Sequence, residues 1–223
     1  MTMWDDTPQP LADCRWQFPS PSEWPQSDLV GRGADLRPET LIHAYMSGIF
    51  PMTSQRARSE DDIAWWSPLQ RGIIPLDGLH VSRSMRRSSR EYRVKIDTCF
   101  EQVMRGCASH KRPGGWINES IIDAYRELHN LGWAHSIETF NEEGALVGGL
   151  YGVRVGRLFA GESMFHLARD ASKVALMHLV DIMITSNMTL LDVQWLTPHL
   201  ESLGAHEIRR SDYLGRLSAA LNP

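Results

Sequence analysis

The sequence predicts an α+β fold in which helices flank a mostly antiparallel sheet. From Ala134 onward, apolar residues alternate with polar ones, which is typical of strands, over 134–140, 145–155 and 158–165. Turn residues separate these strands, and a long helix with one apolar side follows over 171–186. A further apolar stretch at 190–196 predicts a strand beside the one that precedes this helix.

Helix start and stop signals place the other helices. Pro38 suits a first helical position and Gly48 a helix end, whereas Thr98 and Glu101 have the spacing of a capping box. Asn118 begins a further helix with one apolar side. The helices expected outside 171–186 are 38–47, 82–87, 98–107, 119–131, a short one after Pro198, and 211–221.

A change in composition divides the chain near Pro68. Prolines favour extended structure to about residue 30, and the polar stretch 53–62 reads as an exposed loop. We therefore expect a small N-terminal domain over 1–67 and a larger catalytic domain over 68–223.

Composition excludes several classes of protein. The 223 residues are 42% hydrophobic with a net charge of −4, so nucleic-acid binding would need a local basic patch. The three cysteines have no CxxC spacing, which argues against a zinc site and a disulfide framework. With neither a signal peptide nor an 18-residue apolar run, we expect a cytoplasmic protein with no membrane partner.

Polar residues interrupt two strands that should be buried. Glu162 lies in Gly-Glu-Ser-Met-Phe, and Asp192 and Gln194 lie on one face of Leu-Asp-Val-Gln-Trp. Buried carboxylates are costly unless they are paired or used in chemistry. Either Asp192 and Gln194 cap a neighbouring loop and Glu162 meets an arginine, or the three residues form a catalytic site.

Arginines and a tryptophan suggest contact with nucleic acid. Arg83, Arg86, Arg87 and Arg90 fall on one helix face, which is either a solubilising surface or a phosphate-binding site. Trp116 follows a basic, glycine-rich loop at 109–115, where it is either a core residue or a platform for a base.

No nucleophile or phosphate-binding loop is evident from motifs. The strand order, with a glutamate before a long helix, resembles the GNAT-type N-acyltransferase architecture. Coenzyme A users of that architecture carry a glycine-rich loop at this junction, whereas residues 165–170 here contain no glycine. We therefore expect no cofactor and no metal.

Ten short motifs, in order, cover the chain from about Trp16 to Tyr213. They are Phe-Pro-Ser-Pro at 18–21, Gly-Ile-Phe-Pro at 48–51, Trp-Trp-Ser-Pro at 65–68, His-Val-Ser-Arg-Ser-Met at 80–85, Gly-Cys-Ala-Ser at 106–109, Gly-Trp-Ile at 115–117, Ala-His-Ser-Ile-Glu at 134–138, Gly-Gly-Leu-Tyr-Gly-Val at 148–153, Gly-Glu-Ser-Met-Phe at 161–165 and Asp-Val-Gln at 192–194. Through these motifs, the sequence resembles the leucyl/phenylalanyl-tRNA–protein transferase family.

This resemblance implies a monomeric cytoplasmic enzyme with an acyltransferase-like C-terminal domain. It would move Leu or Phe, and Met less well, from aminoacyl-tRNA to proteins that begin with Arg or Lys, marking them for degradation. Asp192 would polarise or orient Gln194, whose carbonyl oxygen would hold the attacking amine. Glu162 would transfer a proton or anchor the acceptor's cationic end.

The resemblance also implies substrate-binding residues. An apolar slot for the aminoacyl side chain would be lined by Leu150, Phe159, Leu176 and Leu179. Trp116 would stack on the terminal adenine, opposite Met52, where the family usually has a second Trp. Phosphates would meet Arg83, Arg86 and Arg87. The family also tends to have Gly where this chain has Ala34.

Two other functions remain open at this stage. A non-catalytic RNA-binding protein would explain the arginines and tryptophans but not the group formed by Glu162, Asp192 and Gln194. A coenzyme A-dependent N-acetyltransferase would need a pyrophosphate site that the glycine-free junction does not offer.

Overall fold

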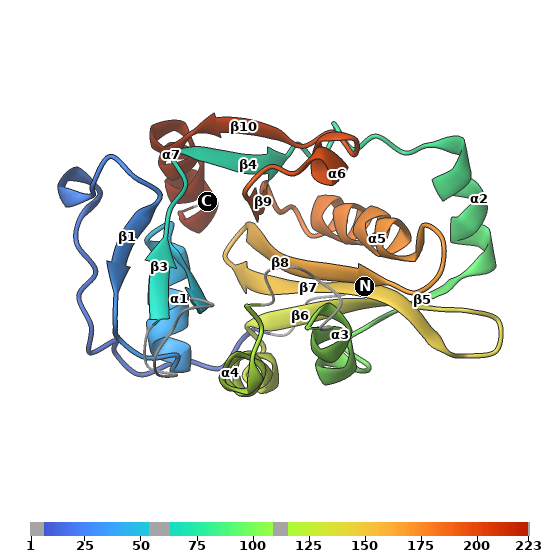
Figure 1. The fold of residues 1–223 in the computed structure, drawn as a ribbon, viewed down its shortest axis with the longest axis horizontal. Coiled ribbons are helices and arrows are strands. Elements are labelled where there is room, and N and C mark those ends of the chain that lie inside the picture. Colours follow the sequence, from blue (N-terminus) through green and yellow to red (C-terminus); the bar gives the residue numbers. More distant parts are fainter. Residues whose placement is uncertain (1–6, 54–62, 109–115, 223) are drawn as a thin grey trace.

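Two sheets and the helices around them make up the computed structural model, which describes residues 7–53, 63–108 and 116–222 (Figure 1). The smaller sheet has the strand order β1-β3-β2 and the larger one β10-β4-β9-β8-β7-β6-β5. The smaller sheet contains β1 (Leu29–Arg32), β2 (Phe50–Thr53) and β3 (Ile63–Trp66). The larger sheet contains β4 (Gln70–Ile74), β5 (Arg93–Ile96), β6 (Ala134–Phe140), β7 (Leu146–Val155), β8 (Leu158–His166), β9 (Leu190–Gln194) and β10 (His206–Arg209).

The helices lie on both faces of the larger sheet and beside the smaller one. They are α1 (Pro38–Met46), α2 (Arg83–Glu91), α3 (Phe100–Cys107), α4 (Glu119–Asn130), α5 (Ala171–Thr185), α6 (Pro198–Glu201) and α7 (Arg210–Leu221). A single turn of 3-10 helix, η1, spans Pro21–Glu23. The α+β class and the mostly antiparallel sheet are therefore confirmed.

The centre of the large sheet forms as its sequence predicts. β6, β7 and β8 are successive antiparallel strands, and left-handed Gly144 and Gly156 turn the chain between them. After α5, the chain enters β9, which pairs with β8 in parallel. This is the only parallel pair in the described sheet, because the other neighbours are antiparallel.

Several short strands were not predicted. β4 pairs with the free side of β9, and β10 extends the sheet beyond β4, whereas β5 covers the opposite edge. Each has four or five residues. Strands this short show too few alternations for a period of two to stand out from the sequence.

Two expectations about helices are wrong. Thr98 does not cap α3, because its amide and hydroxyl both donate to the buried carboxylate of Glu138 on β6. A tertiary contact has replaced the local capping box. The spacing of Ile184 from Leu176 and Val180 predicts that it lies on the apolar side of the helix at 171–186, but it is 54% exposed in the last turn of α5.

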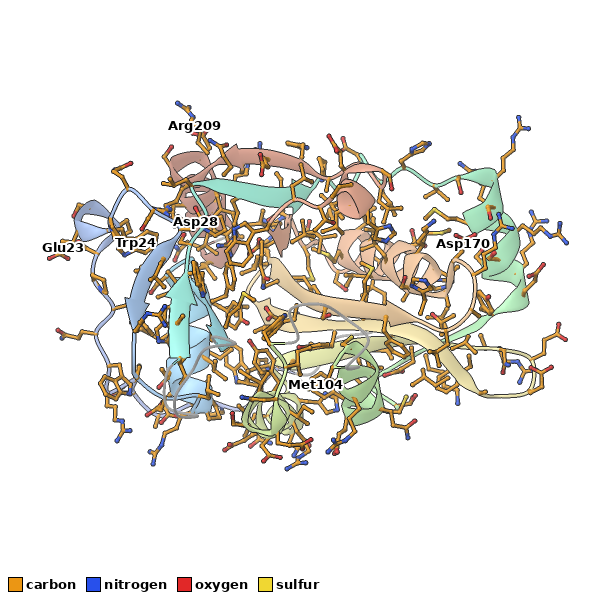
Figure 2. All side chains as sticks on the ribbon, in the orientation of Figure 1. Glu23, Trp24, Asp28, Met104, Asp170 and Arg209 are labelled. Atoms are coloured by element: carbon orange, nitrogen blue, oxygen red, sulfur yellow. The ribbon has the colours of Figure 1, made fainter. Side chains whose placement is uncertain are left out.

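Side chains fill the space on both faces of the large sheet (Figure 2). On one face Leu150 and Phe159 pack with Leu176 and Leu179 of α5. On the other, a larger cluster runs without interruption from Phe50 and Trp65 of the small sheet to α3, α4 and α7. Consecutive residues of β7 therefore belong to different cores, as with Leu150 and Tyr151.

Two loops named in the sequence analysis lie outside the described residues. They are most of the polar stretch 53–62 and the basic segment 109–115 that precedes Trp116.

Candidate active site

The candidate site forms where two parallel strands part. β8 and β9 pair only from Leu158 with Leu190 to Ala160 with Asp192. Beyond that point, β8 stays paired with β7 and β9 stays paired with β4. Glu162 and Gln194 follow on the two diverging strands, and their side chains are joined by a hydrogen bond of 2.9 Å.

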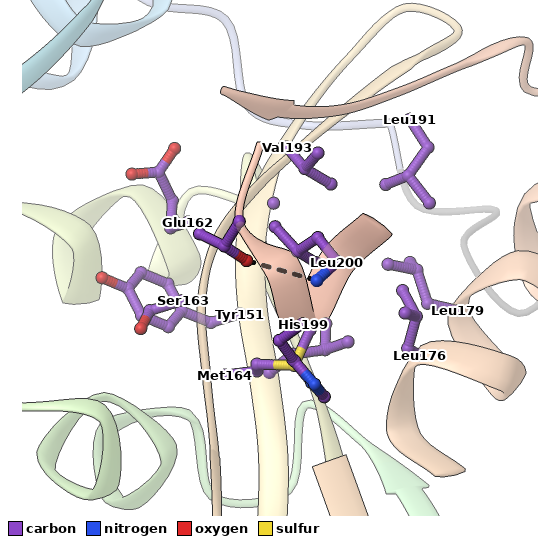
Figure 3. A pocket seen from close by; sticks show the side chains of 13 residues that line it. Tyr151, Glu162, Ser163, Met164, Leu176, Leu179, Leu191, Val193, His199 and Leu200 are labelled. Atoms are coloured by element: carbon purple, nitrogen blue, oxygen red, sulfur yellow. Dashed lines mark hydrogen bonds between the residues drawn. The ribbon is translucent and has the colours of Figure 1, made fainter. Parts of the chain in front are cut away.

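An apolar cavity of about 280 Å³ occupies this opening (Figure 3). Leu176, Leu179 and Leu191 lie on one side of it and Glu162 on the other. A cavity with apolar walls and a polar end suits a ligand with an apolar side chain and a reactive polar group. Its lining comprises Leu150, Tyr151, Gly161, Glu162, Ser163, Met164, Leu176, Leu179, Leu191, Val193, Thr197, His199 and Leu200.

Three of the four residues expected in an apolar slot line this cavity. Leu150, Leu176 and Leu179 do so, whereas Phe159 is fully buried and packs behind them. The sequence reasoning did not place Thr197, or His199 and Leu200 of α6, in this site, although all three line the cavity. The side chain of Thr197 accepts a hydrogen bond from the amide of Leu200 and thereby begins α6.

Glu162 is held by three donors. Its Oε1 accepts hydrogen bonds from the hydroxyl of Tyr45 at 2.7 Å and from the side-chain nitrogen Nε2 of Gln194 at 2.9 Å. Its Oε2 accepts from Tyr125 at 3.3 Å, and the two tyrosine hydroxyls are 2.5 Å apart. These contacts join α1, α4, β8 and β9 at one carboxyl group.

The environment of Glu162 alters its acidity. Burial raises the pKa of Glu162 to about 8, although the hydrogen bond from Tyr45 acts in the opposite direction. Burial also raises the pKa of Tyr45 and Tyr125 well above the ordinary value, so both hydroxyls remain protonated. Glu162 therefore exchanges its proton near neutral pH, as a general acid or base must.

Asp192 has no free acceptor position. Its Oδ1 accepts from Arg71 Nε at 2.8 Å and from the backbone amide of Gln194 at 2.9 Å. Its Oδ2 accepts from the other end of the Arg71 guanidinium at 2.6 Å and from Tyr213 at 2.9 Å. A carboxylate that accepts from this many donors is suited to hold its neighbours in place.

Arg71 is itself enclosed. Its guanidinium lies between the rings of Phe50 and Tyr213, at 4.7 and 4.3 Å from their centroids, and donates to the carbonyl of Gly48. The side chains of Arg71 and Asp192 are 1% and 0% exposed. This fully desolvated pair fixes the start of the diverging segment of β9.

The backbone of Gln194 adopts an uncommon conformation. Its φ is +66°, in the left-handed region that glutamine rarely adopts. The bond from its amide to Asp192 Oδ1 holds this turn. Because the side-chain nitrogen of Gln194 donates to Glu162, the carbonyl oxygen of the same amide is left to accept from another donor.

Glu162, Asp192 and Gln194, which the sequence analysis singled out, thus meet in one hydrogen-bonded group. The residues expected to contact tRNA lie on other elements. Met52 lies on β2 and Trp116 at the start of the segment before α4, and both are half-buried against the larger core. Arg83, Arg86 and Arg87 are exposed on α2, which packs on α5.

Four residues of the site escaped the sequence analysis: Tyr45, Arg71, Tyr125 and Tyr213. Arg71 carried a usable signal, because a cation precedes the apolar run Gly-Ile-Ile of β4, just as Glu162 interrupts β8. The tyrosines carried none, since their positions on helices are also those of ordinary core residues.

Other kinds of site were searched for in the described part of the chain. Within residues 7–53, 63–108 and 116–222, no three His, Cys, Asp or Glu side chains are grouped to hold a metal ion. No helix over these ranges has the length and apolar character needed to cross a membrane.

Comparisons with known proteins agree on one family. Residues 73–218 match the family model for leucyl/phenylalanyl-tRNA protein transferase, and residues 34–69 match the model for its N-terminal domain. A transferase of this name from Maridesulfovibrio salexigens is 46% identical over 92% of this chain and 85% of its own. Another from Cereibacter sphaeroides is 51% identical over 83% of this chain and 86% of its own.

Among solved structures, FemX superposes with a TM-score of 0.49 at 11% identity, covering 77% of this chain and 66% of its own. L-PGS from Bacillus licheniformis gives a TM-score of 0.42 at 17% identity, covering 58% of this chain and 46% of its own.

Proposed function

Because this chain belongs to the leucyl/phenylalanyl-tRNA–protein transferase family, we propose that it transfers Leu or Phe, and Met less well, from aminoacyl-tRNA to protein N-termini. The acceptors begin with Arg or Lys, and the transfer marks them for degradation in the cytoplasm. The observation that carries the proposal is the buried Glu162–Gln194 pair at the end of an apolar cavity.

The apolar cavity receives the aminoacyl side chain. Leu150, Leu176 and Leu179 present only apolar groups to it, and such walls discriminate by about 1–3 kcal/mol per methylene. Accepting Leu, Phe and Met in one cavity follows from this weak discrimination. The ester carbonyl of the donor then lies at the polar end, beside Glu162.

The reaction forms one bond and breaks one. The acceptor's amine nitrogen bonds to the ester carbonyl carbon, the bond from that carbon to the ribose oxygen breaks, and one proton passes from nitrogen to the released oxygen. The carbonyl oxygen of Gln194 accepts from the amine and orients its lone pair. Glu162, with a pKa of about 8, takes the proton and returns it to the ribose oxygen.

Asp192 acts as a positioning residue in this scheme. Its oxygens already accept from Arg71, Tyr213 and the backbone of Gln194, so it orients Gln194 and takes no proton itself. Holding amine and ester in line supplies much of the rate, since effective molarities reach ~10⁵–10⁸ M in such arrangements.

The remaining features of the proposal concern the donor and the domains. Trp116 stacks on the terminal adenine with Met52 opposite, and Arg83, Arg86 and Arg87 contact tRNA phosphates. The enzyme is a monomer that needs no cofactor. Residues 1–67 form the N-terminal domain and 68–223 a GNAT-like catalytic domain, a division supported by the two separate sheets.

A transfer assay tests the function directly. Labelled Leu-tRNA is mixed with the protein and either of two peptides that differ only in beginning with Arg or Ala. Label is expected on the Arg peptide alone. Binding of tRNA without transfer to either peptide would instead support the RNA-binding alternative, and transfer from acetyl-coenzyme A would support the acetyltransferase.

A further inference from the structure

A second cavity, of about 440 Å³, adjoins the apolar one where α2, α6 and the beginning of α5 meet. His199 of α6 lines both cavities, so the two are direct neighbours. The second cavity is lined by serine, histidine and charged side chains, among which Arg169 and Lys173 are cations. The residues used below are Ser84, His166, Arg169, Asp170, Lys173 and His199.

The one carboxylate among the lining residues is already satisfied. Asp170 Oδ1 accepts from Lys173 Nζ at 3.0 Å, and Oδ2 accepts from the hydroxyl of Ser84 at 2.5 Å. The Asp170 side chain is only 6% exposed and lies between α2 and the start of α5 (Figure 2). The carboxylate of Asp170 therefore lies between α2 and α5, away from the solvent side of the cavity.

The basic groups lie on the solvent side. The Arg169 side chain is 84% exposed, and its closest carboxylate oxygen, on Asp170, is 3.8 Å away. The backbone carbonyl of Arg169 accepts from Tyr92 at 2.8 Å, which fixes the loop while leaving the guanidinium outside. His166 is also exposed and lines the same cavity, so imidazole and guanidinium donors both border this opening.

The basic surface continues from this cavity along α2. That helix buries Met85 and Ser88 and exposes its arginines. Arg83, Arg86 and Arg90 make no side-chain hydrogen bond or ion pair with any residue in the described ranges. In a chain of net charge −4, this is a local concentration of cations next to the second cavity, which Ser84 of α2 lines.

We propose that the second cavity binds a backbone phosphate of the 3′ strand of the aminoacyl-tRNA, with Arg169 as its main ligand. The inference rests on the proposed function. With the aminoacyl group in the apolar cavity, the nucleic-acid backbone passes His199, reaches Arg169, and continues along the exposed arginines of α2. The guanidinium pairs with both non-bridging oxygens of one phosphate, and His166 donates to the same group.

The test compares two charge reversals that alter net charge equally. Arg169→Glu removes the proposed ligand, whereas Arg216→Glu changes an exposed arginine of α7, at the opposite end of the molecule (Figure 1). Each variant is assayed with Phe-tRNA and with phenylalanyl-adenosine, a donor that has no phosphate. We expect Arg169→Glu to lower kcat/KM for Phe-tRNA about tenfold at low salt and to leave phenylalanyl-adenosine unchanged.

Salt dependence provides an independent readout. The slope of log affinity for tRNA against log salt should become shallower by about 0.7 for one lost phosphate contact to a single strand. Equal loss with both donors, or equal behaviour of Arg169→Glu and Arg216→Glu, would overturn the proposal. A milder variant, Arg169→Gln, removes the cation without adding a carboxylate and so separates the loss of the ligand from repulsion by the new charge.

Failure of the proposed function gives a different pattern. If the unchanged protein transfers from neither donor, the cavity is tested by binding of a single-stranded RNA oligonucleotide that ends in CCA. Weaker binding with a shallower salt slope for Arg169→Glu alone would support the phosphate site. Identical binding by both variants would refute it.

Discussion

Replacing Glu162 by Gln should make the protein more stable at alkaline pH while abolishing transfer. The folded-state pKa of Glu162, about 8, lies above its ordinary value of 4.5 because the carboxyl is buried. The folded protein therefore holds this proton more tightly than the unfolded chain does. Stability from this group is complete below pH 4.5 and is lost as pH rises through 8.

The size of the effect follows from the shift. At roughly 1.4 kcal/mol per pKa unit, raising the pH from 5 to 8 should lower the free energy of unfolding through this group by about 4 kcal/mol. Gln is isosteric and neutral, and the hydroxyls of Tyr45 and Tyr125 can reorient to pair with its amide. The variant should escape this loss.

Urea unfolding of both proteins at several pH values measures the difference. The free energy of unfolding of Glu162→Gln minus that of the unchanged protein should increase from pH 5 to pH 8. Parallel pH profiles would refute the reasoning about the raised pKa. Transfer that survives in the variant would refute the role of Glu162 as proton acceptor.

Three further changes test other parts of the molecule. Arg71→Met leaves Asp192 buried without its ion-pair partner and should cost about 3–5 kcal/mol in urea unfolding, with much of that recovered in the double variant Arg71→Met/Asp192→Asn; equal instability of the two would contradict the pairing argument. Ala34 has a φ of +64°, so Ala34→Gly should raise the free energy of unfolding by about 1 kcal/mol, and a decrease would show that no strain is relieved. Leu179→Phe narrows the apolar cavity and should lower kcat/KM for Phe-tRNA about tenfold more than for Leu-tRNA, whereas an unchanged ratio would place the aminoacyl side chain elsewhere.

The sequence predicted the parts of the fold that local patterns determine. Asn118 and Ser82 cap their helices as expected, because each side chain accepts from an amide three residues later. The three strands from Ala134 to His166 showed their alternation over seven or more residues each. By contrast, Thr98 was misjudged because Glu138, 40 residues away, supplied the better acceptor.

The same division applies to the site. Glu162, Asp192 and Gln194 were detectable because polar side chains in apolar strands are unusual, and the fold brings them into one network. Their partners were not detectable, since Tyr45 is 117 residues from Glu162 and Tyr213 is 21 residues from Asp192. Pairings over such separations depend on the tertiary fold, and no spacing in the sequence records them.

These partners also bear on how the two proposed domains relate. Tyr45, Gly48 and Phe50 belong to the segment 1–67, yet Tyr45 donates to Glu162, and Gly48 and Phe50 contact Arg71. Both strands of the candidate site thus depend on groups from the N-terminal segment. A boundary near residue 67 can mark a change of sheet, but residues 68–223 alone would leave a buried carboxyl and a buried guanidinium short of partners. Such groups are costly when unpaired, so we expect the isolated larger segment to be inactive even where it folds.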